Sequence, residues 1–182
     1  PSYSSPSSSS STAKISVKPA LIDKFNRKHN YLRMSLTERC NLRCTYCMPL
    51  EGVNLTDATK LLTFEEQKRT ISIFSNLGMT TMRFTGGEPT LNKKLPDLIR
   101  HARSYPSCTS VGITTNGLVL LNQLESLVAA GLTSVNVSLD TLKPEKFAKI
   151  ARREAKGLLK VMASIYGSLA MPELSVKVNI VL

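Results

Sequence analysis

Three cysteines lie close together before residue 50. Cys40, Cys44 and Cys47 are spaced four and then three residues apart, and Tyr46 directly precedes the last of them. One loop can wrap three such thiolates around a single small inorganic centre. An electron-transfer iron–sulfur cluster or a structural zinc is closed by four ligands, so three protein ligands leave one position open. An open position favours catalysis over a purely structural role.

Two other interpretations of these cysteines have less support. A disulfide framework needs an even and dispersed set, and three cysteines this close cannot pair among themselves. Zinc would need Cys108 or a histidine to complete the shell, but no second CxxC or HxxxH partner occurs. We expect Cys108 to be a small half-buried hydrophobe and the two histidines, His29 and His101, to lie at the surface.

Length and composition restrict the class of protein. The 182 residues suffice for one ordinary domain with a real core, and 42% of them are hydrophobic. No apolar run approaches the ~20 residues of a membrane span. The formal net charge is +11, which favours a polyanionic ligand. Charge alone does not choose between a nucleoside triphosphate and a nucleic acid.

The two ends of the chain differ from its body. Residues 1–12 are almost wholly Ser and Pro, and we expect residues 1–24 to form a disordered leader. Its Ser-rich, basic character is typical of the tail of an organelle transit peptide, and a plain flexible leader is the alternative. The chain starts with Pro and stops within a predicted strand, so we expect a fragment whose ordered core is residues 25–182.

The hydrophobic pattern predicts five strands separated by helices. Thr63 and Glu66 form a capping box for a helix that Gly78 ends. Further apolar patterns predict helices at 95–102 and 121–131 and from Pro144 onward, with a last apolar stripe at Leu158, Met162, Ile165, Tyr166 and Leu169. The strands are expected at 32–37, 81–85, 111–115, 134–140 and 175–182. This alternation predicts a parallel sheet with right-handed crossovers.

Side-chain alternation gives these strands one polar face. That face carries Arg33, Arg83, Thr114 and Lys177, with Asn116, Asn136, Ser138, Asp140 and Asn179. A parallel sheet buried on both faces would be apolar throughout, and a closed barrel would fill its interior with branched apolar layers. We therefore predict an open, curved partial barrel whose inner wall holds a large anionic ligand. Arginine and lysine suit phosphate.

A family resemblance covers the chain from about Phe25 to its end. Residues 31–49, YLRMSLTERCNLRCTYCMP, contain the CxxxCxxC spacing of the radical S-adenosylmethionine (SAM) enzymes. This run resembles the GTP 3',8-cyclases of molybdenum-cofactor biosynthesis, as do residues 83–90, 114–117, 136–140 and 176–179. The resemblance implies an α/β fold, a partial (βα) TIM-type barrel with about five parallel strands, truncated before its C-terminal half.

The resemblance also implies a role for individual residues. Cys40, Cys44 and Cys47 would hold a 4Fe-4S cluster whose fourth iron chelates SAM. Contacts to SAM would come from Tyr46, Gly87 and Ser138, and contacts to GTP from Arg33, Arg83, Thr114 and Lys177. Reductive cleavage of SAM would yield a 5'-deoxyadenosyl radical that abstracts the ribose 3' hydrogen of GTP, and the carbon radical would attack C8 of guanine.

Partners and location follow from the same resemblance. It implies a reductant protein as electron donor, no membrane and no nucleic acid, and it leaves a homodimer open. The leader favours the mitochondrial matrix, with the cytoplasm as the alternative.

Gly86 and Gly87 remove side chains where backbone must approach a ligand closely. Glu88 would meet the ammonium of SAM or cap the following helix.

Some positions depart from the family pattern. Thr81 stands where a Lys is common, and Asn92 and Lys94 stand where an Arg and an Asp are common. The family's C-terminal half, with its second three-cysteine cluster, is missing. We expect the chain alone to bind a cluster and SAM but not to turn over GTP. The alternatives are a radical SAM enzyme acting on RNA or peptide, and a non-catalytic metal-binding or metal-free module.

Overall fold

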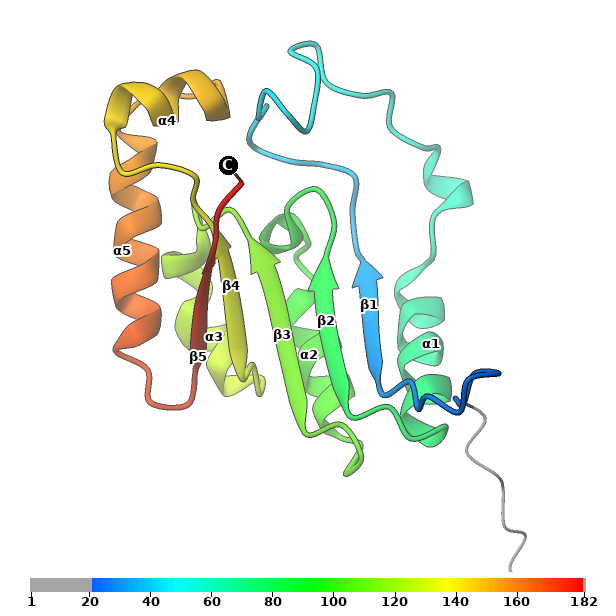
Figure 1. Cartoon of the computed structure of the whole chain (residues 1–182). Coiled ribbons are helices and arrows are strands. Elements are labelled where there is room, and N and C mark those ends of the chain that lie inside the picture. The colour runs from blue at the N-terminus through cyan, green and yellow to red at the C-terminus, as the bar shows by residue number, and fades with distance from the viewer. Residues whose placement is uncertain (1–20, 182) are drawn as a thin grey trace, which may run out of the picture.

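A computed structural model describes residues 21–181, which fold around one five-stranded sheet (Figure 1). All neighbouring strands are parallel, and their order in the sheet is their order in the chain. The strands are β1 (Tyr31–Ser35), β2 (Thr81–Thr85), β3 (Ser110–Thr115), β4 (Ser134–Ser138) and β5 (Ser175–Asn179). The predicted α/β class and parallel sheet are confirmed. The leader residues 1–20 lie outside the described residues, so its predicted disorder stays a prediction.

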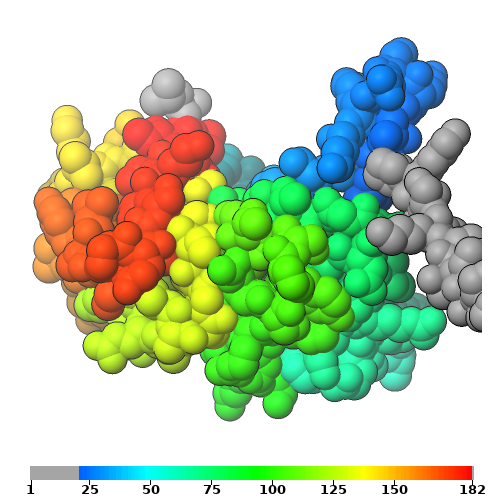
Figure 2. Space-filling view, turned by 90° about the horizontal axis from the view of Figure 1, so that it is seen from below, coloured from blue at the N-terminus to red at the C-terminus, as the bar shows by residue number. Residues whose placement is uncertain are grey.

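Helices connect the strands and cover one side of the sheet. They are α1 (Phe64–Asn76), α2 (Leu95–Arg103), α3 (Leu124–Ala129), α4 (Pro144–Ala151) and α5 (Gly157–Leu169), with short 3-10 turns η1 (Ala58–Lys60), η2 (Pro89–Leu91) and η3 (Leu120–Gln123). Figure 2, seen from below, shows the helical segments following one another in chain order along one side, with β5 (red) on the other. Within the described residues, no helix is both long and apolar enough to cross a membrane.

The hydrophobic core lies between the sheet and these helices. Alternate strand residues face it and are fully or almost fully buried: Met34, Met82, Phe84, Val111, Ile113, Val135 and Val137. The helices contribute Ile71, Leu95, Leu98, Ile99, Leu124, Leu127 and Val161. Each such side chain contributes about 1.5–3 kcal/mol through burial. The opposite residues of every strand therefore form a second face, which the helices do not cover.

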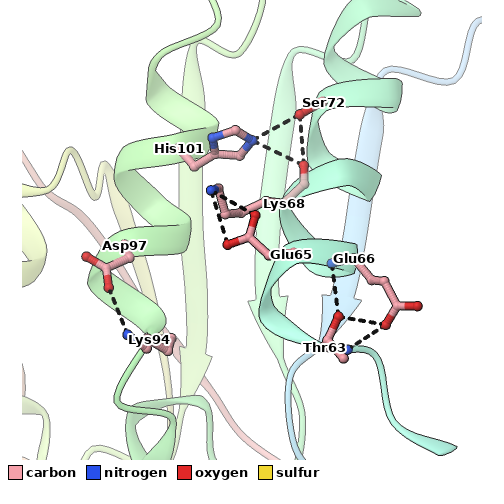
Figure 3. Close-up of polar contacts among 8 residues, drawn as sticks. All are labelled: Thr63, Glu65, Glu66, Lys68, Ser72, Lys94, Asp97 and His101. Atoms are coloured by element: carbon pink, nitrogen blue, oxygen red, sulfur yellow. Dashed lines mark hydrogen bonds and ion pairs between the residues drawn. The ribbon is translucent and has the colours of Figure 1, made fainter.

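The predicted start of α1 is confirmed in detail. The Thr63 backbone N–H donates to Glu66 Oε2 at 2.8 Å, and the Glu66 N–H donates to Thr63 Oγ1 at 3.3 Å (Figure 3). This reciprocal cap satisfies donors that would otherwise lack partners at the helix start. Figure 3 also shows how α2 joins α1, because His101 Nε2 lies 3.0 Å from Ser72 Oγ.

The apolar stripe predicted for α5 is partly wrong. Tyr166 and Leu169 are 65% and 61% exposed, whereas Ser164 and Ser168 are buried. Ser164 decides the orientation: its hydroxyl donates to the Gly117 carbonyl at 2.6 Å and accepts from the Leu121 N–H at 3.1 Å. Small polar residues therefore select the packed face of this helix, a preference that an apolar pattern does not reveal.

Several predicted element ends also need correction. β1 starts one residue early and stops at Ser35 rather than 37, while β4 and β5 stop two and three residues short of their predicted ends. The backbone N–H of Leu36 still donates to the Thr85 carbonyl. Beyond these ends, the segment that follows each strand turns away from the sheet and forms a loop at its carboxyl edge. These loops carry the candidate site.

Candidate active site

The uncovered sheet face gathers the predicted polar residues. Arg33 on β1 is in register with Arg83 on β2, and Asn136 on β4 lies between Thr114 and Lys177. Arg33 and Lys177 are exposed, and Arg83 and Thr114 are half-buried. Two like charges in register on adjacent strands repel each other, so this pair favours an anion that lies against both. The structure therefore places all four predicted substrate residues on one face.

Arg83 is held flat against this face. Its Nη1 donates to the Ile113 carbonyl at 2.9 Å, and its Nη2 donates to Ser134 Oγ at 3.1 Å. Gly112 makes room for it, because a Cβ there would lie 2.9 Å from Arg83 Cζ. The guanidinium thus crosses β3 and reaches β4. Its position is fixed before any ligand arrives, which lowers the entropy cost of binding one.

The cysteine loop follows β1 at the carboxyl edge of the sheet (Figure 1). Cys40 and Cys44 are half-buried and Cys47 is exposed. Burial raises the pKa of the Cys44 thiol, and charge on Cys40 and Cys47 raises this pKa further. A bound metal centre would reverse this effect, because it favours the thiolate.

Three thiolates from one loop are the kind of ligand that iron–sulfur clusters use. Within residues 21–181, no group of three or more His, Cys, Asp and Glu side chains is arranged to hold one metal ion. A cluster needs no such convergence, because each thiolate binds a different iron. The Leu42 N–H also donates to Cys40 Sγ at 3.4 Å, an interaction that stabilises negative sulfur. The three-thiol loop therefore fits a cluster.

Cys108 and the histidines do not complete a zinc shell. Cys108 precedes β3 and His29 precedes β1, so both lie at the amino ends of the strands, opposite the cysteine loop. Cys108 is 1% exposed, more deeply buried than predicted, and His101 is half-buried against α1 rather than at the surface. His29 is exposed as expected.

Gly86 and Gly87 fasten the cysteine loop to the end of β2. A Cβ on Gly86 would lie 2.5 Å from the Thr37 carbonyl oxygen, and one on Gly87 would lie 2.4 Å from that of Arg39. The Gly87 and Glu88 N–H groups donate to these same two carbonyls at 2.6 and 2.8 Å. Close approach is thus required as predicted, but the approaching backbone in the structure is the chain's own. The predicted contact of Gly87 with SAM stays a prediction.

Glu88 is a buried structural carboxylate. It is 0% exposed, and it accepts hydrogen bonds from the Thr90 N–H and hydroxyl, the Thr115 hydroxyl and the Asn116 N–H. Such a set of donors stabilises a buried charge. Of the two interpretations of Glu88, the cap of the following turn is the one the structure shows.

Asn116 extends this network to a cysteine sulfur. Its Oδ1 accepts the Leu118 N–H at 3.0 Å, which fixes the orientation of the amide. Its Nδ2 consequently points to the cysteine loop, 2.7 Å from Asn41 Oδ1 and 3.8 Å from Cys40 Sγ. Sequence reasoning placed Asn116 on the polar face but missed this contact. The Asn-Gly pair after β3 was the available signal.

Tyr46 and Ser138 line one small cavity beside Cys44 and Asn116. The Tyr46 hydroxyl donates to Asp140 Oδ2 at 2.8 Å, and the other oxygen of Asp140 accepts the Val181 N–H at 2.9 Å. Burial, followed by the hydrogen bond to Asp140, raises the pKa of Tyr46 well above its usual range. Asp140 therefore ties the cysteine loop to the ends of β4 and β5, a role not predicted from the sequence.

Family comparison agrees with this arrangement of a parallel sheet and a three-cysteine loop. The family model described as "Radical SAM superfamily" matches residues 34–165. This match covers most of the chain and spans the end of β1, the cysteine loop and β2 to β4. The chain therefore belongs to the radical SAM superfamily.

More particular relatives share nearly half of their aligned residues with the chain. The chain is 48% identical over 162 residues to molybdenum cofactor biosynthesis protein 1 of Dictyostelium discoideum, covering 89% of this chain and 25% of that protein. Its identity to the mitochondrial GTP 3',8-cyclase of Arabidopsis thaliana is 47%, and the alignment covers 91% of this chain and 42% of that protein. Its identity to the GTP 3',8-cyclase of Syntrophomonas wolfei is 43%, and the alignment covers 88% of this chain and 49% of that protein. The chain thus spans from about a quarter to half of these relatives' length.

Solved structures share the fold at low sequence identity. The structure titled "Native anSMEcpe with bound AdoMet" matches with a TM-score of 0.61 at 21% identity, covering 82% of this chain and 43% of that one. Methylornithine synthase matches with a TM-score of 0.59 at 17% identity, covering 82% and 44%. These likenesses support the predicted partial barrel.

Substituting Gly87→Ala tests how the cysteine loop is fastened. The added methyl group would overlap the Arg39 and Glu38 carbonyl oxygens, so the loop must move, and overpacking of this kind costs about 1–3 kcal/mol. We expect faster hydrogen exchange at the Gly87 and Glu88 amides, measured by NMR or mass spectrometry.

Gly78→Ala is the matched control for this substitution. Gly78 has a positive φ, which Gly87 does not, so alanine there strains the local backbone, but a Cβ at Gly78 meets nothing within 4 Å. Exchange at residues 87 and 88 should stay unchanged in the control. Unchanged exchange in the Gly87 variant as well would contradict the proposed fastening.

Proposed function

We propose that this chain is the cluster-binding part of a GTP 3',8-cyclase. That enzyme converts GTP to (8S)-3',8-cyclo-7,8-dihydroguanosine 5'-triphosphate in the first step of molybdenum-cofactor biosynthesis. One observation carries the proposal: the uncovered sheet face with Arg33, Arg83 and Lys177 belongs to the same sheet whose carboxyl edge bears the three-cysteine loop. The 43–48% identity to the relatives described above supports it.

The cysteine loop would hold the cofactors. Cys40, Cys44 and Cys47 would bind a 4Fe-4S cluster, and because three thiolates leave one iron without a protein ligand, that iron would be available to SAM. When bound, this pair of cofactors supplies a 5'-deoxyadenosyl radical after one-electron reduction. Tyr46 and Ser138, which share a cavity with Cys44, would contact SAM, and Gly87 would offer backbone at the same edge.

The sheet face would hold GTP. Arg83 is already fixed and retains guanidinium N–H groups for a phosphate, while Arg33 and Lys177 flank it from β1 and β5. Charge-assisted hydrogen bonds of this kind position phosphates strongly, and Thr114 would add a neutral contact. The contribution of the protein is to position GTP, because the cofactors supply the reactive species.

Location and partners complete the proposal. We propose the mitochondrial matrix, because the similar Arabidopsis protein is named as mitochondrial. A reductant protein would supply the electron.

The direct test of function incubates the protein at its full natural length, after anaerobic reconstitution, with GTP, SAM and reductant. The cyclised nucleotide is the expected product, and SAM cleavage dependent on RNA or peptide instead of GTP would refute the proposal.

Replacing the loop cysteines tests the cluster site. In reconstituted residues 1–182, Cys40→Ser, Cys44→Ser and Cys47→Ser should each lose most of the iron and most of the iron–sulfur absorption. The reason is that the shell has no spare thiolate: Cys108 lies at the other end of the strands.

The control is Cys108→Ala, which should keep the full iron content. Iron measured per chain decides the matter. Equal iron loss in the Cys108 variant, or stoichiometric zinc in place of iron, would contradict the assignment.

Neutralising the sheet face tests the substrate site. Lys177→Gln and Arg83→Gln should each weaken GTP binding about 10- to 100-fold, because one charge-assisted contact contributes about 1.5–3 kcal/mol. Within the described residues, the exposed Lys177 side chain forms no hydrogen bond or ion pair, so its replacement should leave the fold intact. Arg69→Gln, an exposed substitution on α1, is the control. Isothermal titration with GTP that gives equal affinity for all three variants would refute the site.

Asn116 should tune the reduction potential of the cluster. Asn116→Asp keeps the oxygen that accepts the Leu118 N–H but removes the donor to Cys40 Sγ. Losing a donor to sulfur destabilises the reduced, more negative cluster, so the midpoint potential should fall by tens of millivolts (a rough conversion of about 1 kcal/mol). Redox titration followed by EPR measures the change.

Asn136→Asp controls for the added charge. Asn136 lies on the same sheet face, in register with Lys177. A potential that shifts equally in both variants would indicate a charge effect alone and contradict the role given to the Asn116 amide.

A further inference from the structure

The turn between α4 and α5 carries a concentrated positive charge. Residues 143–160 contain seven lysines and arginines against two glutamates. Six of the seven are exposed, and Arg152 is half-buried. Within the described residues, this segment forms a single ion pair, between Lys156 and Glu154. Most of this charge is therefore not compensated by carboxylates in the described part of the chain. We call residues 143–160 the basic surface.

The basic surface is continuous with the cysteine loop. Arg152 Nη1 donates to the Met48 carbonyl at 3.2 Å, and Arg153 Nε donates to the Asn41 carbonyl at 2.6 Å. In the other direction, the backbone N–H groups of Arg43 and Thr45 in the cysteine loop donate to the last two carbonyls of α4, those of Ala151 and Ile150. Figure 1 shows α4 beside the loop at the carboxyl edge of the sheet.

The shape and position of this surface indicate a partner outside the catalytic face. A hollow of about 530 Å³ at the turn is lined by four cationic side chains and one carboxylate: Arg152, Arg153, Lys156, Lys160 and Glu154. α5 packs on the helix-covered side of the sheet, whereas Arg83 and Lys177 lie on the uncovered side. A molecule at the hollow can thus approach the cysteine loop without entering the space proposed for GTP.

We propose that the basic surface docks the acidic face of a one-electron carrier protein, a reduced flavin or iron–sulfur protein, which reduces the cluster. This inference rests on the proposed function. The carrier loses one electron and the cluster gains it, and no bond or proton is exchanged. Clustered positive charge accelerates encounter with an acidic protein and disfavours basic ones. The contacts of Arg152 and Arg153 then place the docked carrier against the loop that holds the cluster.

Charge reversal tests the docking surface. The docking variant is Lys156→Glu with Lys160→Glu, and a second variant is Lys146→Glu with Lys149→Glu on α4. The control, Lys93→Glu with Arg69→Glu, makes the same charge change on exposed residues elsewhere. The probe is an acidic flavodoxin in its fully reduced form, and stopped-flow absorbance follows reduction of the reconstituted cluster.

The inference predicts a selective effect. Both basic-surface variants should be reduced by flavodoxin at least tenfold more slowly than the control, with a weaker dependence on salt. Reduction by photoreduced deazaflavin, a small donor that needs no docking, should be equal in all variants. Equal flavodoxin rates in the basic-surface and control variants would overturn the inference.

Binding to the cluster-free chain separates this inference from the proposed function. Fluorescence anisotropy with labelled flavodoxin should show weaker binding by both basic-surface variants, whether or not a cluster can be loaded. A chain that binds flavodoxin in this way but takes up no iron would refute the proposed function and leave the docking surface standing. Binding of inorganic phosphate that requires Lys156 and Lys160, with flavodoxin binding unchanged, would assign the hollow to a small anion and overturn the inference.

Discussion

The site depends on close backbone contact between the end of β2 and the chain that leads into the cysteine loop. Gly87 and Glu88 donate to the carbonyls of Thr37 and Arg39, at a separation that no side chain on Gly87 would allow. This contact determines where the loop leaves the sheet. Without this contact, the cysteine loop would lose the two backbone hydrogen bonds that join it to Gly87 and Glu88 at the end of β2.

Buried polar groups carry this contact across the sheet edge. The carboxylate of Glu88 binds the end of β3 through Thr115 and Asn116, and the Asn116 amide reaches Cys40. On the other side, Asp140 holds Tyr46, and the end of α4 pairs with the loop backbone. The loop is therefore positioned by β2, β3, β4 and α4 together, which is the support a preorganised catalytic site requires.

Much of this could be predicted from the sequence, because the decisive signals are local. Strand alternation placed Arg33, Arg83, Thr114 and Lys177 on one face, and the capping box placed the start of α1. The orientation of α5 could not be predicted in the same way, since Ser164 is buried for its hydrogen bonds rather than for its hydrophobicity. The partners of Glu88, Asn116 and Asp140 depend on side chains distant in the sequence, which no pattern in one chain reveals.

The central claim is that a three-thiol loop and a cationic sheet face serve one reaction. Crystals of the reconstituted protein with SAM and GTP, measured at the iron absorption edge, test it most directly. The account predicts anomalous iron density at Cys40, Cys44 and Cys47, and a triphosphate against Arg33, Arg83 and Lys177. Iron elsewhere, or phosphates bound away from the uncovered sheet face, would contradict it.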